Sequence, residues 1–283
     1  MTLKVSSYAK INIGLRILGK RPDGYHEIET IFQQISLKDE IEITSLQDDI
    51  VLECNDQNCP RDYSNLAYKA ARLLKDEIHK SVGCSIKLFK RIPIGAGLGG
   101  GSSNAATVLK ALNELWDVHL PQDELVRIAE KIGSDVPFFI YGGTCIGQGR
   151  GEILTPIEPP GNIWGVLVCP PFGISSKWAY QSSNFSLTKM QKKGKFRSFG
   201  NIFPQLEVWK DVFTNDLEPV VFAKYPIIRS FVERFYELGA FFSQMSGSGS
   251  SSFGLFTEQE GAEQAYEALS GEFKKFLFHF CQT

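Results

Sequence analysis

The chain has 283 residues, of which 43% are hydrophobic, and its formal net charge is −2. This length suggests about two domains, and the apolar fraction suffices for a full core without disulfides or metal. The slightly negative charge argues against nucleic acid as the main partner. No apolar run approaches the roughly 20 residues that a membrane span needs, so a membrane protein is not expected. With no signal peptide at the N-terminus and no Cys-x-x-Cys pair, we expect a cytoplasmic protein without a zinc site.

The first half of the chain is predicted to alternate strands with helices. Apolar residues with a period of two favour strands, and apolar residues at helical spacing favour helices. Arg21-Pro-Asp-Gly predicts a turn, Ser64 or Asn65 is suited to cap a helix, and Pro137 favours an extended segment after Asp135. The expected elements are strands at 11–17, 27–35, 40–45 and 84–88, and helices at 65–78, 103–115 and 122–132.

A Pro- and Gly-rich stretch at 155–162 is the best candidate for a linker. We therefore expect one domain over 1–158 and a second over 159–283. In the second domain the order of elements contains the split β-α-β pattern of a ferredoxin-like fold. Its expected elements are strands at 164–169, 240–245 and 252–256, helices at 176–181, 226–238 and 258–269, and an apolar end at 276–281. The basic insert at 188–198 is interpreted as a solvated loop.

A glycine-rich loop between an expected strand and an expected helix is the strongest functional signal. Glycine allows positive φ and close approach of the backbone to a ligand, and the N-terminus of the next helix attracts anions. Ser102 or Ser103 is expected to cap that helix or to bind phosphate or Mg²⁺. The predicted nucleotide-binding loop consists of Pro93, Ile94, Gly95, Ala96, Gly97, Leu98, Gly99, Gly100, Gly101, Ser102 and Ser103.

Several other classes of glycine-rich loop fit this sequence less well. A Walker A loop requires Gly-Lys-Ser/Thr, which is absent. Gly95, Gly97 and Gly100 match the dinucleotide pattern G-x-G-x-x-G, but no acidic residue ends a second strand roughly 20 residues later. The His-Arg-Asp and Asp-Phe-Gly motifs of protein kinases are also missing. A loop without a ligand would lose backbone entropy at five glycines without compensation. A different class of phosphate-binding loop is therefore favoured.

The loop resembles the second motif of the GHMP kinases, a family that includes galactokinase and the homoserine, mevalonate and phosphomevalonate kinases. Tyr8-Ala-Lys-Ile-Asn-Ile-Gly-Leu resembles the first motif of that family, and Met245-Ser-Gly-Ser-Gly-Ser-Ser-Ser-Phe-Gly resembles the third. The resemblance implies an α+β fold with a ribosomal S5 domain 2-like N-terminal domain and a ferredoxin-like C-terminal domain. It also implies a small-molecule kinase that uses ATP with Mg²⁺.

The resemblance further implies two catalytic residues. Asp135 matches the family's catalytic aspartate, which takes the proton of the acceptor hydroxyl. Lys10 matches its partner, which keeps the aspartate ionised and offsets charge on the transferring phosphoryl group. From position alone, Lys10 would be a surface lysine on a strand and Asp135 a turn residue. No acidic residue matches the Mg²⁺ ligand of some GHMP kinases, so no metal ligand is predicted.

One branch of the family fits more closely, through Arg21-Pro-Asp-Gly-Tyr-His-Glu-Ile and Asn215-Asp-Leu-Glu among other segments. This branch phosphorylates the 2-hydroxyl of a cytidine diphosphate-linked methylerythritol in the non-mevalonate isoprenoid pathway. Tyr25 and His26 resemble the pair that binds the cytidine by stacking and hydrogen bonding, and Asn12 resembles a contact near the reacting hydroxyl. Residues that resemble the adenine-side wall are Asn65, Leu66 and Lys90.

Two alternatives remain open at this point. The chain could be another GHMP kinase, such as a homoserine kinase, although the Tyr25-His26 pair speaks against an acceptor without a base. It could also be a non-catalytic nucleotide or metabolite sensor on the same fold. Retention of Lys10 and Asp135 speaks against the sensor.

Overall fold

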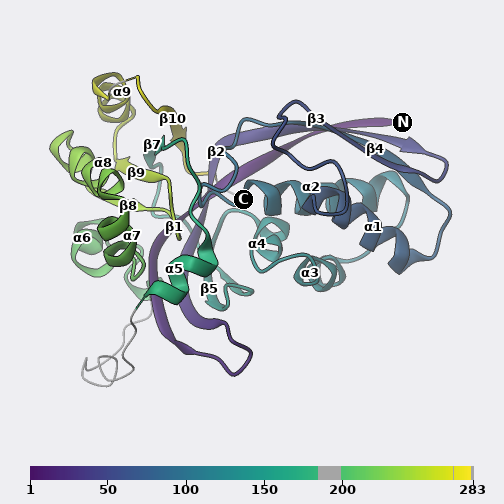
Figure 1. The fold of residues 1–283 in the computed structure, drawn as a ribbon, viewed down its shortest axis with the longest axis horizontal. Coiled ribbons are helices and arrows are strands. Elements are labelled where there is room, and N and C mark those ends of the chain that lie inside the picture. Colours follow the sequence, from purple (N-terminus) through teal and green to yellow (C-terminus); the bar gives the residue numbers. More distant parts are fainter. Residues whose placement is uncertain (184–198, 270, 282–283) are drawn as a thin grey trace. The chain divides into compact units, whose positions relative to one another are not determined.

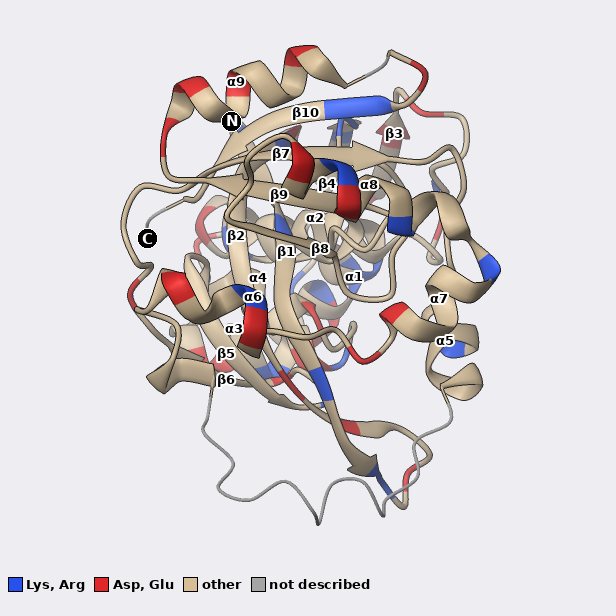
Figure 2. Ribbon diagram, turned by 90° about the vertical axis from the view of Figure 1, so that its left-hand side faces the viewer, with Lys and Arg blue, Asp and Glu red and all other residues tan. Residues whose placement is uncertain are grey.

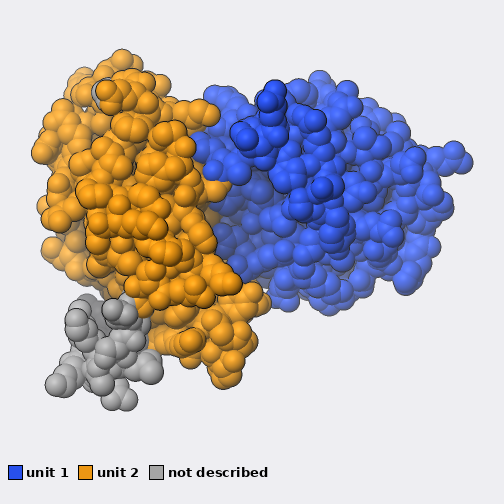
Figure 3. Space-filling view, in the orientation of Figure 1, with its two compact units in different colours: residues 1–9, 37–94, 99–142 blue, residues 10–36, 95–98, 143–283 orange. Residues whose placement is uncertain are grey.

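The computed structural model describes residues 1–183, 199–269 and 271–281 (Figure 1). The chain forms two compact units, coloured separately in Figure 3. Unit 1 consists of residues 1–9, 37–94 and 99–142, and unit 2 consists of residues 10–36, 95–98 and 143–283. These units are defined by contacts within the folded chain, and each combines several separate stretches of sequence, whereas the two predicted domains are continuous stretches. The expected domain boundary between residues 158 and 159 therefore stays a prediction.

Unit 1 consists of part of a β-sheet and four helices. The second half of β2 (His26–Leu46) pairs antiparallel with β4 (Gly83–Phe89), and β3 (Ile50–Cys54) pairs parallel with β4. On β4 the side chains of Cys84, Ile86 and Leu88 are buried at every second position, as the sequence predicts. The helices are α1 (Leu66–Ile78), α2 (Gly100–Leu115), α3 (Gln122–Glu130) and α4 (Val136–Tyr141).

Of two helices in unit 1, α4 differs from the sequence prediction and α1 agrees with it. The extended segment that Pro137 favours does not form, because α4 begins at Val136 and carries the proline in its first turn. Proline is tolerated there, since the N–H groups of a first turn have no partner within the helix. Helix α1 begins as expected, with the Asn65 side chain accepting a hydrogen bond from the N–H of Ala67 at 2.9 Å.

Unit 2 contains the rest of two long strands. Strand β1 (Thr2–Lys20) begins in unit 1 and continues into unit 2, and β2 begins in unit 2 and ends in unit 1. Within unit 2, β2 pairs antiparallel with β5 (Thr144–Gly149), which pairs in turn with β6 (Ile153–Pro156). Strand β6 lies at the start of the stretch that the sequence predicts as a linker. The basic insert at 188–198 lies outside the described residues.

A second sheet in unit 2 has the strand order β10-β7-β9-β8, with every neighbouring pair antiparallel. Together with two helices that follow β7 and β9 in the chain, this order is the ferredoxin-like arrangement, which confirms the fold predicted for this part. Its elements are β7 (Trp164–Cys169), α8 (Pro226–Glu237), β8 (Phe242–Met245), β9 (Ser252–Phe256), α9 (Gln259–Ala268) and β10 (Lys274–His279). The intervening helices are α5 (Ser176–Ser182), α6 (Trp209–Val212) and α7 (Glu218–Lys224).

The core of the second sheet is apolar, and of the two helices beside it α8 carries charges of both signs whereas α9 carries only acidic residues. Phe231 and Phe235 of α8 are buried with Val166 and Val168 of β7. On α8 the acidic and basic residues alternate and form ion pairs such as Arg229–Glu233 (Figure 2). Over the described part of the chain, we find no helix with the length and apolar character that crossing a membrane requires.

Candidate active site

Lys10 is buried in unit 2 and is held by an amide and an aromatic ring. Its side chain lies on β1, is 4% exposed as a residue, and donates from Nζ to Oδ1 of Asn12. The same Nζ lies 5.3 Å from the centre of the Phe32 ring. Asn12 in turn donates from Nδ2 to Oγ1 of Thr30 at 3.0 Å. Because each group is buried and bonded, the ammonium has a defined position rather than the mobility of a surface lysine.

The three glycine-containing motifs meet within unit 2. The carbonyl of Gly97 accepts a hydrogen bond from Ser246 Oγ at 3.0 Å, and that hydroxyl accepts one from the N–H of Asn12 at 3.2 Å. The N–H of Lys10 donates to the carbonyl of Leu98 at 3.0 Å. Gly97 has φ +79°, and a Cβ there would lie 2.4 Å from the carbonyl oxygen of Ser246. Only glycine therefore allows the middle of the loop to lie against this hairpin.

The segment Asn215-Asp-Leu-Glu positions the hairpin of the third motif. Asn215 donates from Nδ2 to the carbonyls of Met245 and Gly247 at 3.0 and 2.8 Å. Glu218 accepts a hydrogen bond from the N–H of Met245 at 2.9 Å. Burial raises the pKa of the Glu218 carboxyl to about 7, because a charge is disfavoured away from water.

The end of the predicted nucleotide-binding loop lies in unit 1, where it becomes helix α2. The N-cap is Gly99, with φ +67°, so the expectation that Ser102 or Ser103 caps the helix is wrong. The helix begins earlier than predicted because glycines 99–101 provide its first turn. Ser103 is buried and its hydroxyl is 2.8 Å from that of Ser7, whereas Ser102 is only half-buried. Ser102 is thus the more accessible of the two predicted phosphate contacts.

A buried ion pair supports the same region of unit 1. Lys90 Nζ pairs with Asp39, and their side chains are 6% and 0% exposed. The other oxygen of Asp39 accepts the N–H groups of Arg91 and Ile92 at 2.7 and 2.9 Å. Asn104 of α2 accepts from Lys90 Nζ at 3.0 Å and donates to Asp39 at 2.9 Å. Asp39 therefore ties the strand before the loop to the helix after it, a role that no sequence pattern indicates.

The predicted adenine-side residues cluster around the start of α2. A Cβ built on Gly101 would lie 3.7 Å from Cδ1 of Leu66, and one built on Gly100 would lie 3.3 Å from Nζ of Lys90. Asn65 donates to the carbonyl of Pro60 at 2.7 Å in addition to capping α1. The structure thus places Asn65, Leu66 and Lys90 near one another, while their contact with adenine stays a prediction.

Asp135 lies in unit 1 directly before α4, and its side chain does not cap that helix. Its residue is half-buried. The role of Asp135 as the catalytic base stays a prediction.

The predicted cytidine pair lies in unit 2 at the turn between β1 and β2. Tyr25 is 57% exposed, and His26 stacks on Tyr180 of α5 with ring centres 5.3 Å apart. Partial burial, together with the charge of Lys20, lowers the pKa of His26, which favours the neutral imidazole. Tyr180 is an aromatic residue that the sequence interpretation missed, because it lies some 150 positions away in the chain and only the fold brings it to His26.

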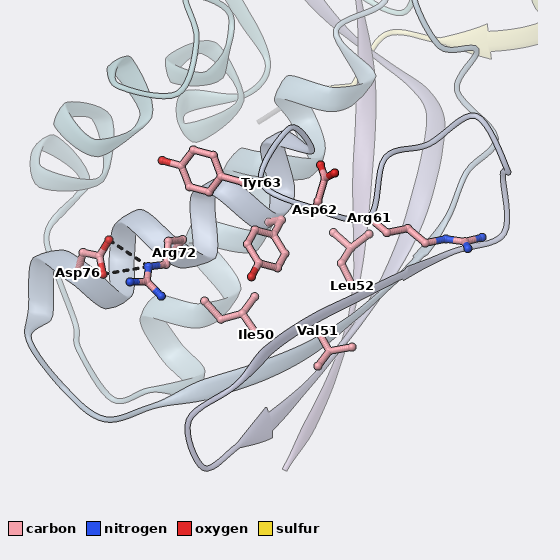
Figure 4. Close-up of a pocket in the computed structure, with 9 residues that line it drawn as sticks. Ile50, Val51, Leu52, Arg61, Asp62, Tyr63, Arg72 and Asp76 are labelled. Atoms are coloured by element: carbon pink, nitrogen blue, oxygen red, sulfur yellow. Dashed lines mark hydrogen bonds and ion pairs between the residues drawn. The ribbon is translucent and has the colours of Figure 1, made fainter.

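A separate pocket of about 500 Å³ lies within unit 1, between β3 and the outer side of α1 (Figure 4). Tyr63, Tyr68 and Arg72 line it, and Arg72 pairs with Asp76 at its edge. None of the predicted site residues lines this pocket. In the described part of the chain, no group of three or more His, Cys, Asp or Glu residues could hold a metal ion.

Comparisons with known proteins agree with these motifs. Residues 65–143 match the GHMP kinases N terminal domain, and residues 192–275 match the GHMP kinases C terminal family. A 4-diphosphocytidyl-2-C-methyl-D-erythritol kinase from Prosthecochloris aestuarii is 42% identical over 276 residues, which is 96% of each chain. One from Geobacillus kaustophilus is 40% identical over 279 residues, covering 96% of this chain and 94% of that one.

Solved structures show the same relationship. A crystal structure of 4-(cytidine 5'-diphospho)-2C-methyl-D-erythritol kinase superposes with a TM-score of 0.82 at 31% identity, covering 99% of this chain and 100% of that one. A homoserine kinase from Cytophaga hutchinsonii has a TM-score of 0.76 at 17% identity, covering 99% and 95%. At that identity the second likeness demonstrates the fold alone.

Proposed function

The chain belongs to the 4-diphosphocytidyl-2-C-methyl-D-erythritol kinases of the GHMP kinase family, and we propose that it transfers the γ-phosphoryl group of ATP to the 2-hydroxyl of 4-diphosphocytidyl-2-C-methyl-D-erythritol. The product would be an intermediate of the non-mevalonate route to isoprenoid precursors. We further propose a cytoplasmic location.

One observation carries the proposal beyond family membership. Lys10, the middle of the glycine loop and the hairpin of the third motif are joined by hydrogen bonds within a single unit. The bonded residues are 88 to 234 positions apart in the sequence, so their meeting is a property of the fold. A glycine-rich motif without such contacts would support nucleotide binding much less. The arrangement favours a working kinase over a sensor that has lost its catalytic geometry.

In the proposed reaction the acceptor hydroxyl oxygen attacks the γ-phosphorus, and the bond from that phosphorus to the bridging oxygen of ADP breaks. Asp135 would take the proton from the hydroxyl. Lys10, oriented by the amide of Asn12, would offset the negative charge on the transferring group. The N–H groups at the start of α2 would hold the phosphates of ATP, as helix N-termini do for anions.

Mg²⁺ is proposed as the partner of ATP, where it would neutralise charge on the β- and γ-phosphates. Mg²⁺ in phosphoryl-transfer sites is commonly bound through the phosphates with only one or two protein ligands, and we propose that the phosphates supply most of its coordination here as well. Ser102, a half-buried residue in the first turn of α2, is the protein hydroxyl that we propose joins them.

Recognition of the acceptor is assigned to Tyr25 and His26. The exposed Tyr25 ring offers a flat face for the pyrimidine, and base stacking on an aromatic ring is typically worth about 1–3 kcal/mol. His26 is held against Tyr180, so a ring nitrogen would meet the base edge in a fixed orientation. These contacts would distinguish the substrate from homoserine or mevalonate, which have no base.

The test is an ADP-release assay with Mg-ATP and a panel of acceptors. We expect turnover of 4-diphosphocytidyl-2-C-methyl-D-erythritol and none above background with homoserine or mevalonate. Absence of turnover with the first acceptor would contradict the proposal. Preference for homoserine would instead support the alternative that the chain is a homoserine kinase.

The same assay tests the assigned base. Asp135→Asn should lower kcat by about 10²- to 10⁴-fold while nucleotide binding is kept, because the amide cannot accept the proton. Asp123→Asn, a change at an exposed residue of α3, is the matched control and should leave kcat unaltered. Full activity of Asp135→Asn would show that the base is wrongly assigned.

A further inference from the structure

The backbone of Tyr25 is held firmly while its ring remains exposed. The N–H of Tyr25 donates to Oδ1 of Asp23 at 3.0 Å, and its carbonyl accepts the N–H of Arg21 at 2.8 Å. The guanidinium of Arg21 bonds both Asp23 and Glu27, so it closes the turn between β1 and β2. These contacts fix the backbone at Tyr25, but they do not fix the side-chain torsion angles that orient its ring.

A second turn, between β5 and β6, lies beside this one. In the register of β2 and β5, Ile28 is opposite Gly149, so the residues that follow Gly149 lie at the level of Tyr25. Glu152 accepts the N–H of Arg150 at 2.5 Å and lies 3.4 Å from its Nε. Gly149 has φ +70°, and a Cβ there would lie 2.9 Å from Oε2 of Glu152. The tight turn and its carboxylate therefore direct the Arg150 side chain.

The guanidinium carbon of Arg150 lies 5.1 Å from the centre of the Tyr25 ring, which is the distance of a cation–π contact. The carboxylate of Asp23 lies close enough to Arg150 to interact with its charge. Its pKa is lowered first by the hydrogen bond from the N–H of Tyr25, with smaller contributions from the charges of Arg21 and Arg150. Arg150 is thus the side chain that connects the two turns.

We infer that Arg150 is a positioning residue for the acceptor: its guanidinium holds one face of the Tyr25 ring, so that the opposite face is presented to the pyrimidine of the cytidine. This inference rests on the proposed role of Tyr25 in binding the base. Arg150 acts through Tyr25, because an aromatic ring fixed before binding loses less rotational freedom when the base stacks on it. A planar guanidinium suits this contact better than an ammonium does.

The test compares acceptor KM in single and double variants. Arg150→Met keeps the length of the side chain and should raise the KM for the acceptor about 2- to 5-fold, with kcat and the KM for ATP unchanged. Arg150→Lys should restore part of the loss. In a Tyr25→Leu background, Arg150→Met should have no further effect on KM. Arg229→Met, a change at an exposed arginine of α8, is the matched control and should leave KM unaltered.

Two outcomes would overturn the inference. An equal rise in KM with and without the Tyr25 ring would show that Arg150 acts independently of Tyr25. A fall in kcat and in melting temperature, with no change specific to the acceptor, would show a purely structural role.

A second measurement is independent of turnover, and so separates this inference from the proposed function. In protein labelled with 3-fluorotyrosine, the ¹⁹F resonance that disappears in Tyr25→Leu should shift in Arg150→Met but not in Arg229→Met. An unmoved resonance would contradict the contact itself. Absence of acceptor turnover in the unaltered protein, with the resonance shifting as expected, would count against the proposed function instead.

Discussion

Lys10 of unit 2 and Lys90 of unit 1 are both buried lysines near segments of the phosphate loop, yet their surroundings differ in chemistry. Lys10 contacts the neutral amide of Asn12 and faces the Phe32 ring. Lys90 contacts the carboxylate of Asp39, which is itself bonded to two backbone N–H groups. The Asn12 amide orients the Lys10 ammonium, whereas the buried Asp39 carboxylate both orients and neutralises the Lys90 ammonium.

The difference separates two uses of a buried positive charge. In unit 1 the charge of Lys90 is balanced within the fold, so its main effect is to join β4 and α2 on either side of the loop. In unit 2 the position of Lys10 beside all three motifs suits it to a ligand's negative charge. Loss of Asp39 or Lys90 should therefore appear first as lost stability, and loss of Lys10 as lost catalysis.

The largest effect on stability is expected from Asp39→Ala. Removing one partner of a buried ion pair leaves the other charge uncompensated, which typically costs about 3–5 kcal/mol. The free energy of unfolding, measured by urea denaturation, should fall by that order. The double variant Asp39→Leu with Lys90→Met should lose less, because no charge remains buried. Asp48→Ala, at an exposed carboxylate paired with Lys75, should cause a much smaller change. Equal losses at residues 39 and 48 would contradict the comparison.

Lys10→Met should act on the reaction instead. Removing one group that stabilises developing charge typically lowers kcat by about 10²- to 10³-fold. Steady-state kinetics with saturating ATP and acceptor would measure it, and Lys87→Met, at an exposed lysine of β4, serves as the control. If Lys10→Met retained normal kcat, the distinction between the two lysines would fail.

Glu218→Gln tests how the hairpin of the third motif responds to pH. The pKa of Glu218 is about 7 in the folded chain against an ordinary value of 4.5, so the folded state favours the protonated form. Its stabilising contribution is therefore complete below pH 4.5 and is lost as pH rises through 7. The shift corresponds to roughly 3 kcal/mol. Melting temperatures measured from pH 4.5 to 8 should show that the unaltered protein loses stability relative to Glu218→Gln as the pH rises. The same pH dependence in both proteins would contradict this prediction.

The smallest effect is expected from Asn65→Ala. Loss of an N-cap side chain typically costs about 0.5–2 kcal/mol, and here it removes the hydrogen bond to Ala67. Thermal unfolding would measure the loss. Ser175→Ala removes the corresponding cap of α5 in unit 2, where the hydroxyl accepts from Trp178 at 3.3 Å, and provides a matched comparison. A stability unchanged by Asn65→Ala would show that α1 is determined by packing alone.

The main elements of both units could be predicted because their signals are local. Apolar alternation indicates β4, and Pro226 with Gly239 marks the ends of α8. The prediction failed where local preference competed with packing. Pro137 favours an extended chain, yet it occupies the first turn of α4, whose side chains from Val136 to Ile140 are all buried. The glycines before Ser102 are poor helix formers, yet they begin α2.

The candidate site divides in the same way. The sequence by itself predicts the phosphate-binding loop, the two catalytic candidates and the Tyr25-His26 pair, because a motif is a run of neighbouring residues that can be compared with a family without the fold. Only the tertiary structure decided what surrounds them: Asp39 beside Lys90, Tyr180 against His26 and Arg150 over Tyr25. These partners come from distant strands, turns and helices, and strand register and packing bring them together. No pattern along the chain encodes such a distance.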